Sequence, residues 1–403
     1  MRTVDEYLAE CLAVAEPLPP FTVILDDAVG CIVAEDVRSL VDVPQADLSG
    51  RDGYAVRVAD LLGATREAPV TLPVLEEIRA DNVAASSLIP GAVTRISSGA
   101  VLPRGAQAVV PIEWTDQGRA EVQIFGMVSE GDNIRRQAED LAAGEVILPA
   151  GVRIGSRQIA LLASAGHSRV LVHPSPRVVI IAIGDELQEP GLPATHGKIF
   201  DANSHALATA VRDIGGTVYR VGSVSDDKRE LRELLEDQVV RADVIITTGG
   251  LSYGGGDTLK EVLSPLGSIR FDNVAMSPGR QVGVGKLDDA TIFCLPGSPV
   301  AAWTSFEVFV RPALRKMAGH NHIFRRSIPA RVLRGWESPV GEQEYVRGVV
   351  AGNPTDGYRV EPAGDPQRPL LTGMSEANCL AIVPAEQTTV AVGDVLDCVV
   401  LNR

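Results

Sequence analysis

The alternation of apolar and amphipathic segments between residues 174 and 324 places the strongest constraint on the fold. Short runs rich in β-branched residues are separated there by stretches with helical spacing. A strand buried on both faces reads as a continuous apolar run, and strands that alternate with helices predict a parallel α/β sheet. The expected strands are 178–183, 217–222, 243–248 and 291–295, and the expected helices are 201–214, 227–241, 257–265 and 299–318.

The segments outside this region show different patterns of apolar residues. Short apolar runs separated by Gly, Pro and Asn predict β-rich domains before and after it. Residues 3–16 and the segment 138–172 show helical spacing instead, and prolines follow the first of them. We therefore expect four parts: a split N-terminal helical domain of residues 1–42 and 138–173, an inserted β domain of 43–137, an α/β domain of 174–324 and a C-terminal β domain of 325–403.

Charge and cysteine usage limit the partners and the compartment. The formal net charge of −15 argues against a nucleic-acid partner, because binding to a polyanion requires clustered Lys and Arg. The five cysteines are scattered without a C-x-x-C pair, which favours a reducing cytoplasm over a disulfide framework. No segment reads as a signal peptide or reaches the roughly 18 apolar residues of a membrane span, so we expect no membrane association.

A glycine-rich segment, TTGGLSYGGGDTLKEVL, directly follows the third expected strand. A turn with few side chains lets backbone N–H groups approach a phosphate or a pterin, and the following helix N-terminus favours negative charge. The segment matches neither the P-loop nor the dinucleotide-binding pattern. The alternative is a plain loop in which Asp257 caps the helix. The candidate ligand-binding residues are Gly249, Gly250, Ser252 and Gly254.

Acidic residues follow the first expected strand. Asp185 and Glu186 come directly after it, and they share a sheet edge with Asp257 if the strands are parallel. Carboxylates gathered at one edge indicate a Mg²⁺ site that holds substrate phosphates, because hard cations take oxygen ligands. A solvated turn with an ordinary capping acid is the alternative.

Two further segments belong to the same region. A Pro-Gly-Ser-Pro turn follows the fourth strand, again on the expected sheet edge. Arg280 lies beside a glycine turn, where its planar fork is suited to phosphate or molybdate oxygens; an exposed, solvated Arg is the alternative. The turn consists of Pro296, Gly297, Ser298 and Pro299.

The inserted β domain and its return segment contribute three more candidates. Asp52 lies in the compact turn DLSGRDGYAVR, which alternatively is a simple Asp-Gly turn. Ser98 precedes a glycine, and its hydroxyl and amide are suited to grip an oxyanion. Asp140 follows a basic pair in a charged run that also fits a solvated face.

Histidines offer no clear metal site. Only His320 and His322 lie close together, and no cysteine or third ligand accompanies them. We interpret this pair as exposed linker sequence.

Taken in order, these segments resemble the molybdopterin molybdenumtransferase family, whose eukaryotic relative is the E domain of gephyrin. Each segment alone is a weak pattern, but their joint order along nearly the whole chain is highly specific. The segments are DLSGRDGYAVR, RISSGAVLPRGAQAVV, NIRRQAEDLAAGEVILPAG, AIGDEL, IFDANS, TTGGLSYGGGD, the PGR turn, LPGSPVAA, GEQEYVRG and SEANCLAIVP.

The resemblance implies an elongated homodimer with a split helical domain, an inserted β domain, an α/β molybdopterin-binding domain and a C-terminal β-barrel. The active cleft of such proteins lies between the α/β domain of one subunit and the β domain of the other. Family membership further implies adenylylated molybdopterin as substrate, molybdate as metal donor, Mg²⁺ as cofactor, and molybdenum cofactor and AMP as products. Other cofactor-assembly proteins are the remaining partners to expect.

The same resemblance gives the candidate residues their roles. Mg²⁺ near Asp185, Glu186 and Asp257 is expected to orient the pyrophosphate. Arg280, Ser98 and Arg347 are expected to position molybdate, so that catalysis is mainly proximity and electrostatic stabilisation. The expected catalytic set, drawn from both subunits, is Asp52, Ser98, Asp140, Glu186 and Asp257.

The chain departs from the family pattern in several places. Ser277 and Gln281 stand where relatives have the lysine and proline of a Lys-Pro-Gly-Lys-Pro turn, and Arg280 replaces its second lysine. Ser98, Ser298 and Cys379 replace the usual Thr, Asn and Gly. These changes leave three alternatives open: a catalytically weakened paralogue, a non-catalytic pterin-binding scaffold like gephyrin, and a module for another reaction such as pterin adenylylation.

Overall fold

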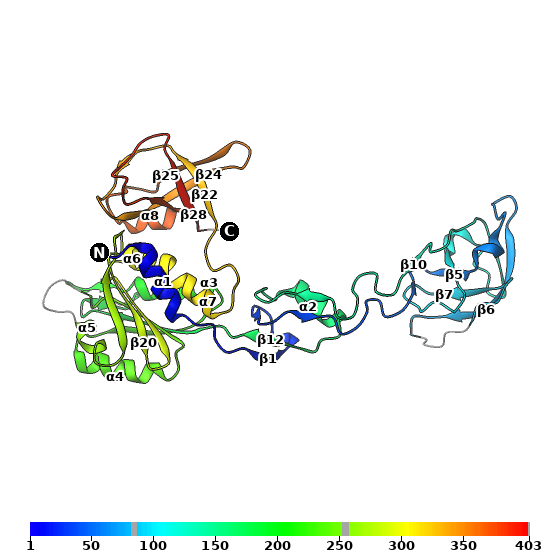
Figure 1. Cartoon of the computed structure of the whole chain (residues 1–403), viewed down its shortest axis with the longest axis horizontal. Helices are drawn as coiled ribbons and strands as arrows, with labels where there is room; N and C mark the ends of the chain where they lie inside the picture. The colour runs from blue at the N-terminus through cyan, green and yellow to red at the C-terminus, as the bar shows by residue number, and fades with distance from the viewer. Residues whose placement is uncertain (82–86, 252–257, 402–403) are drawn as a thin grey trace.

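The computed structural model describes residues 1–81, 87–251 and 258–401. The molecule is elongated (Figure 1): the α/β domain and the C-terminal domain lie together at one end, and the inserted β domain lies at the other. A slender middle domain connects the two ends. In the described residues, no helix combines the length and the hydropathy that a bilayer span requires.

The α/β domain is built on a six-stranded sheet with the order β16-β13-β17-β21-β20-β18. The four strands expected from the sequence are present and run parallel to one another. In β13, β17 and β21 the apolar, β-branched residues are buried on both faces, as the sequence pattern requires, whereas β16 at the edge of the sheet is only partly buried. These strands are β16 (Thr217–Val224), β13 (Arg177–Ile183), β17 (Val244–Thr248) and β21 (Ala290–Leu295).

Two antiparallel strands, β20 (Gln281–Leu287) and β18 (Ser268–Asn273), extend the sheet beyond the predicted set. Glycines in β20 obscured its strand pattern in the sequence. The structure explains them: a Cβ at Gly285 would lie 2.2 Å from the carbonyl oxygen of Ser268. Only a glycine permits this close backbone approach.

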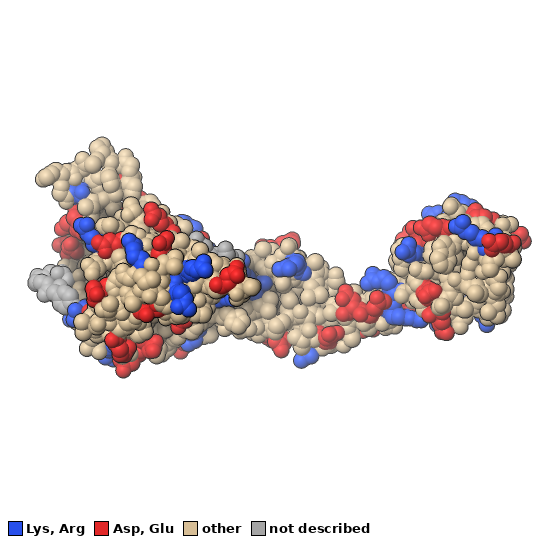
Figure 2. Space-filling model, turned by 90° about the horizontal axis from the view of Figure 1, so that it is seen from above, with Lys and Arg blue, Asp and Glu red and all other residues tan. Residues whose placement is uncertain are grey.

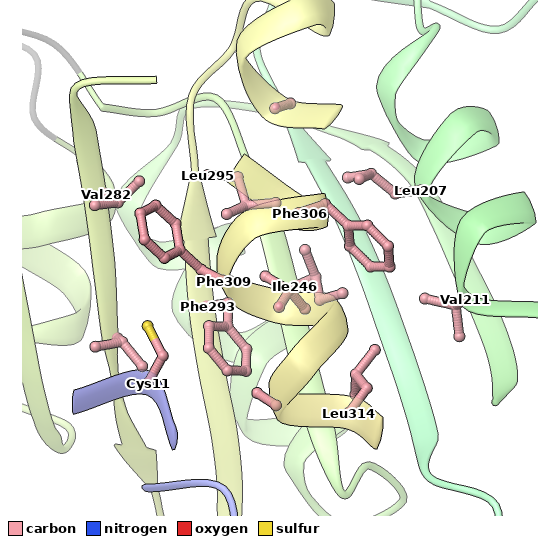
Figure 3. Packing of buried hydrophobic residues seen from close by; sticks show 14 of the residues in the cluster. Cys11, Leu207, Val211, Ile246, Val282, Phe293, Leu295, Phe306, Phe309 and Leu314 are labelled. Carbon is pink, nitrogen blue, oxygen red and sulfur yellow. The ribbon is translucent and has the colours of Figure 1, made fainter. Parts of the chain in front are cut away.

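Helices cover both faces of the sheet. On one face the helix expected over 299–318 is continuous and includes a π-helical turn (Figure 3), with Phe306, Phe309 and Leu314 packed against Ile246 and other sheet residues. On the other face, α4 and α5 cover a second apolar cluster. The helices are α3 (Asn203–Asp213), α4 (Lys228–Val239), α5 (Thr258–Leu263), α6 (Pro299–Ser305), the π-helical η4 (Phe306–Val310) and α7 (Arg311–Met317).

The N-terminal helix α1 (Val4–Val14) packs on the α/β domain, not with the split domain in which the sequence placed it. Thr3 and Glu6 form a capping box at its start. The ring of Tyr7 meets the ring of Phe309 edge to face, with centroids 4.8 Å apart. Helical periodicity identifies the face that becomes buried but not the element that buries it.

The middle domain begins only at β1 (Phe21–Ile24), which pairs with β12 (Arg169–His173) from the returning chain. The helical segment expected over 138–172 is shorter than predicted, since α2 covers Ser156–Ser164. The remaining elements are η1 (Leu25–Asp27), β2 (Ile32–Val33), β3 (Val37–Arg38) and β11 (Val146–Leu148).

The inserted β domain contains a five-stranded sheet with the order β8-β5-β7-β6-β9 and buries apolar clusters on both of its faces. Its strands are β5 (Gly53–Val56), β6 (Val70–Ile78), β7 (Val93–Ile96), β8 (Ala108–Pro111) and β9 (Glu121–Ile124), with β4 (Leu48–Ser49) and β10 (Ile134–Arg135) paired at its base and short 3-10 turns η2 (Val58–Leu61) and η3 (Ile112–Trp114).

The C-terminal domain is a β-barrel, because β24 pairs with both β25 and β26 and closes the order β24-β25-β22-β28-β26 into a ring. The short β19 of the preceding domain adds to β24. The elements are β19 (Met276–Ser277), β22 (Ser327–Val332), β23 (Trp336–Glu337), β24 (Gln343–Asn353), β25 (Gly357–Pro362), α8 (Leu371–Glu376), β26 (Cys379–Val383), β27 (Thr389–Val390) and β28 (Val395–Val400).

A buried carboxylate ties the barrel to the α/β domain. Glu307, in the π-helical turn, accepts hydrogen bonds from the Arg325 guanidinium at 2.7 and 3.0 Å and lies 3.7 Å from Arg311. Arg325 also donates to the carbonyl oxygen of Leu401 at 2.5 Å, near the end of the barrel. The linker between the two domains is therefore held by charge-assisted hydrogen bonds away from bulk water.

We expect Glu307→Ala to lower the free energy of unfolding by about 3–5 kcal/mol, because removing the buried carboxylate leaves the partly buried guanidinium of Arg325 without its ion-pair partner. Urea denaturation of the full chain measures the change. Glu233→Ala is the control, since Glu233 forms an exposed ion pair with Arg229 on α4 and is expected to cost less than about 0.5 kcal/mol. Equal losses in the two variants would contradict a structural role for the buried group.

Candidate active site

Three strand ends of the α/β sheet meet around one cavity. The sheet register aligns Ala182 of β13 with Thr248 of β17, and Thr248 with Leu295 of β21, so the three strands end at the same level. A cavity of about 250 Å³ opens beyond these ends. This is the edge of an α/β sheet at which ligands bind in many such folds. The lining residues are Ile183, Gly184, Glu186, Leu187, Ile199, Asn203, Asp226, Thr248, Gly249, Gly250, Leu251 and Gly297.

Asn203, at the start of α3, joins two of the strand ends. Its Nδ2 donates to the hydroxyl of Thr248 at 2.7 Å and to the carbonyl oxygen of Gly297 at 2.8 Å. The Thr248 hydroxyl in turn donates to the carbonyl oxygen of Pro296 at 2.8 Å. The Oδ1 of Asn203 is buried and accepts no hydrogen bond from the described residues. A buried, unpaired acceptor at the wall of a cavity is a ready contact for a ligand N–H or O–H group.

The turn after β17 has a backbone geometry that requires glycine. Gly249 has a φ of +88°, and a Cβ there would lie 2.2 Å from the carbonyl oxygen of Ile183 on the neighbouring strand. Gly250 also has a positive φ, of +68°. The expected binding residues Gly249 and Gly250 therefore line the cavity with backbone alone. The candidates Ser252, Gly254 and Asp257 lie outside the described residues.

Carboxylates gather at the same edge. Glu186 lines the cavity, and the neighbouring Asp185 accepts a hydrogen bond from the amide of Asp226 at 3.3 Å. Burial raises the pKa of the Asp226 carboxyl, and the negative charges of Asp185 and Glu186 raise it further. Asp226, which follows β16, was not singled out from the sequence.

The acids do not form a preorganised metal site on their own. Among residues 1–81, 87–251 and 258–401, no group of three His, Cys, Asp or Glu side chains is arranged to hold a metal ion. Asp185, Glu186 and Asp226 nevertheless bring negative charge together at this edge, where a cation would relieve repulsion between the carboxylates. Oxygen donors of this kind suit Mg²⁺, which retains several water ligands and needs few protein ligands.

The remaining residues of the α/β candidate set lie beside this cavity, not in its wall. Pro296, Ser298 and Pro299 belong to the same turn as Gly297, and Ser298 is the exposed N-cap position of α6. Arg280 is half-exposed after the Ser277–Pro278 turn, and its guanidinium lies 3.6 Å from the carboxylate of Glu342. Neither Arg280 nor Ser298 lines the cavity.

Arg347 is buried in the barrel with no carboxylate hydrogen-bonded to it among the described residues. Its Nη2 donates to the carbonyl oxygens of Arg368 at 2.9 Å and Asp365 at 3.4 Å. Its Nε is buried without a hydrogen-bond partner in the described part of the chain. Burial lowers the pKa of this guanidinium, although nearby Glu344 and Asp365 oppose the shift. The arrangement leaves donor capacity for an anion.

Asp52 and Ser98 meet in the inserted β domain. The amide of Ser98 donates to the Asp52 carboxylate at 2.8 Å, which joins the turn before β5 to the turn after β7. Asp140 is exposed on the return segment, where its amide donates to the carbonyl oxygen of Val43 at 3.0 Å. Within one chain, strands β5 and β7 lie at the opposite end of the molecule from the α/β sheet (Figure 1). A single chain therefore does not unite the two halves of the candidate set.

The fold and the site define a multidomain enzyme with an α/β ligand-binding domain. Family models for the N-terminal region of MoeA (domains I and II), a probable molybdopterin-binding domain and the C-terminal region of MoeA (domain IV) match residues 2–166, 179–316 and 329–401. The chain belongs to the MoeA family of molybdopterin molybdenumtransferases, which are enzymes of molybdenum cofactor biosynthesis. The resemblance and the fold class predicted from the sequence are thereby confirmed.

Individual relatives cover the whole chain. Molybdopterin molybdenumtransferase 1 of Mycobacterium tuberculosis is 37% identical, with 100% of both chains covered. Molybdopterin molybdenumtransferase of Staphylococcus aureus is 30% identical over 98% of this chain and 94% of the relative. A crystal structure of the molybdopterin biosynthesis MoeA protein of Pyrococcus horikoshii superposes with a TM-score of 0.79 at 27% identity, covering 99% of this chain and 100% of that one.

Proposed function

We propose that the chain inserts molybdate-derived molybdenum into the dithiolene of adenylylated molybdopterin and releases AMP. The supporting observation is the cavity at the sheet edge, which Asn203, Gly249, Gly250, Glu186 and Asp226 line together and in which Asn203 keeps an unpaired Oδ1 among the described residues. Donors, an acceptor and carboxylates around one cavity suit a polar, phosphorylated heterocycle.

The complete site is proposed to need two copies of the chain. Asp52 and Ser98 are fixed to each other but lie at the far end of the molecule from the cavity. In a homodimer with closed two-fold symmetry, the β domain of each copy faces the α/β domain of the other, and two equivalent sites result. Asp140, on the exposed return segment, would then approach the same cleft.

Mg²⁺ is proposed to bind at the carboxylates of the sheet edge. Asp185, Glu186 and Asp226 supply oxygen donors, and Asp257 is the further candidate from the adjacent segment. The bound cation supplies positive charge for the pyrophosphate oxygens of the substrate. Because the pKa of Asp226 is raised, this carboxyl takes up a proton at a higher pH than an ordinary aspartate does. Cation affinity is accordingly expected to decline as the pH falls.

Molybdate is proposed to be positioned by arginine and by polar groups of the β domain. Arg347 has an unpaired Nε, and Arg280 is half-exposed beside the turn that replaces the lysine-containing one. Asp52 holds the backbone amide of Ser98 in place, and the Ser98 hydroxyl is proposed to reach the cleft from the facing chain. The protein contributes chiefly by positioning the reactants and stabilising charge.

Glu342→Gln is expected to lower the KM for molybdate about fivefold with little change in kcat, because the Glu342 carboxylate lies 3.6 Å from Arg280 and competes with the anion for that guanidinium. Steady-state kinetics of cofactor formation at varied molybdate concentration measure the effect. Glu361→Gln, an exposed change on β25 of the same barrel, is the control. An unchanged or higher KM would show that Arg280 does not contact molybdate.

The proposed activity is tested directly with the purified full-length chain, adenylylated molybdopterin, molybdate and Mg²⁺. We expect AMP release together with cofactor that activates a nitrate reductase apoprotein. Tight binding of the pterin without AMP release would identify a scaffold instead. A slow but complete reaction would identify the weakened paralogue that the changes at Ser277, Gln281, Ser298 and Cys379 leave open.

A further inference from the structure

One wall of the cavity at the sheet edge is a short surface segment, here called the flap. It consists of residues 187–200, with β14 (Leu187–Gln188) and β15 (Ile199–Phe200) paired in parallel. Residues of both strands line the cavity, as does Asn203 at the start of α3. Residues 190–200 are exposed, so apolar burial does little to fix the flap. Polar contacts therefore decide where this wall lies relative to Asn203.

Arg220, on the edge strand β16, joins the flap to α3. Its Nη2 donates to the two carboxylate oxygens of Glu189 at 2.8 and 3.1 Å. Its Nε donates to the hydroxyl of Ser204 at 2.9 Å. Glu189 directly follows β14, and Ser204 directly follows Asn203 in the chain. One rigid, planar guanidinium thus connects the neighbours of two cavity-lining segments.

The sheet register brings the Arg220 side chain to this position. Arg220 pairs with Ile180 of β13, and paired residues of neighbouring strands project from the same face of a sheet. Ile180 packs in the apolar cluster beneath α3, together with Leu207 and Val211. The Arg220 side chain therefore lies on the face that α3 covers, within reach of the start of that helix.

Asp201 stiffens the α3 end of this connection. Its side chain is 1% exposed, and its carboxylate accepts hydrogen bonds from the amide of Ser204 at 3.0 Å and from the Ser204 hydroxyl. Its amide donates to the carbonyl oxygen of Gln188 in the flap at 3.0 Å. Arg220 supplies positive charge 3.9 Å from the Asp201 carboxylate. A carboxylate this deeply buried needs both hydrogen bonds and a nearby cation, so Arg220 serves both walls at once.

The contacts of Arg220 differ from the surface ion pairs of the chain. Figure 2 shows acidic and basic side chains interspersed over one face of the molecule, and exposed pairs of this kind contribute little to stability. The Arg220 side chain is only 22% exposed. Its hydrogen bonds lower the pKa of the Glu189 carboxyl. Glu189 therefore stays ionised, and bound to Arg220, near neutral pH.

His205 gives the flap a second contact with α3. Its Nε2 lies 3.2 Å from the Oε1 atom of Glu189, and both side chains are about half exposed. Glu189 keeps this partner on α3 when Arg220 is changed, so an arginine substitution loosens the flap without releasing it fully. His320, by contrast, is half-buried in the linker after α7, so its interpretation as exposed linker sequence is wrong.

We propose that Arg220 is a positioning residue for substrate binding: it holds the flap and Asn203 at the separation that the heterocycle of the substrate requires. Arg220 is not among the residues that line the cavity, so it acts through Glu189 and Ser204. The proposal rests on the function proposed for this cavity. It adds a residue that shapes the cavity from behind its walls.

Hydrogen exchange of the full chain tests the positioning without substrate. In Arg220→Gln we expect the amides of residues 187–204 to exchange at least about tenfold faster, because the flap and the start of α3 lose their shared donor. Arg220→Lys keeps the charge but not the planar fork, and it is expected to recover only part of the protection. Arg177→Gln is the matched control with wild-type exchange in this segment, because it removes an arginine–carboxylate pair at the opposite end of β13.

Steady-state kinetics then show whether the substrate depends on this arrangement. We expect Arg220→Gln to raise the KM for adenylylated molybdopterin about tenfold and to change kcat less than about twofold, because the walls bind ground state and transition state alike. Glu189→Ala, a change at a half-exposed side chain, is the second variant if Arg220→Gln does not fold. It is expected to raise the KM and to accelerate exchange in residues 187–200 while the contact between Arg220 and Ser204 remains.

Faster exchange together with a raised KM supports the proposal. Wild-type exchange and KM in both variants would overturn it, and so would faster exchange with an unchanged KM, because the walls would then move without consequence for binding. If the wild type releases no AMP, the proposed function fails, and equilibrium binding of adenylylated molybdopterin replaces the KM in the same comparison. A wild type that does not bind this probe would overturn the proposal as well.

Discussion

Gly249→Val is expected to reduce kcat/KM for cofactor formation by at least about 100-fold, because the turn that lines the proposed ligand cavity can no longer form. The φ of Gly249 is +88°, which a β-branched residue does not adopt without strain. The added Cβ would also lie 2.2 Å from the carbonyl oxygen of Ile183. The turn must therefore move away from β13, and the backbone lining of the cavity moves with it.

Steady-state AMP release and equilibrium pterin binding measure this effect. We expect the rate of AMP release and the affinity for the pterin both to decrease. Gly215→Ala is the matched control: its φ is +87°, but a Cβ there meets no atom within 4 Å. The control carries the backbone strain of about 1 kcal/mol without the steric clash. Near-wild-type binding and turnover in Gly249→Val would show that the glycine turn does not touch the substrate.

Asp52→Ala is expected to lower kcat by about 10²–10³-fold with little loss of stability, because the exposed carboxylate fixes the Ser98 turn and is proposed to carry charge toward the reacting groups. Asp52→Asn keeps a hydrogen-bond acceptor for the Ser98 amide and separates the two contributions. If positioning dominates, the Asn variant recovers most of the rate; if charge dominates, it does not.

The control for Asp52→Ala comes from the same domain. Asp60 accepts a hydrogen bond from the amide of Gly91 at 3.1 Å, so Asp60→Ala removes a comparable contact away from the proposed cleft. We expect this variant to retain wild-type kinetics. Cofactor formation at the wild-type rate in Asp52→Ala would remove Asp52 from the site.

The parallel part of the α/β sheet was predictable because its signal is local. Segments such as Val178–Ile183 are continuously apolar and β-branched, and two-face burial is the usual reason for such a run. Strand β20 was missed because its glycines interrupt the apolar pattern of a strand. The reason for the glycines is the close approach of the β18 backbone, which a local sequence pattern does not reveal. The partner of α1 was missed for a related reason. The sequence identifies the apolar face of α1, but the sheet that α1 covers is more than 150 residues away along the chain.

The candidate site was predictable in part. The glycine turn and Glu186 were found because they directly follow expected strands, and strand ends of a parallel sheet converge. Asn203 was quoted only within a motif, and its role depends on contacts with Thr248 and Gly297, which are 45 or more residues away. Asp226 follows a strand end as well, so the same rule applied to β16 would have found it.

The separation of the two halves of the site has a different origin. Sequence order places Asp52 and Glu186 in different domains but does not say whether one chain can bring them together. The extended middle domain holds them apart (Figure 1), so only a facing copy of the chain can complete the proposed cleft.

Complementation between two inactive variants tests this central claim most directly. Asp52→Ala impairs the β-domain half, and Gly249→Val impairs the α/β half; each mixed dimer then contains one site with both halves intact. We predict that co-expressed, randomly paired chains recover about one quarter of wild-type cofactor formation, whereas the variants purified separately and assayed apart stay inactive. Mixed dimers that remain inactive, although each chain is folded, would contradict a site shared between two copies.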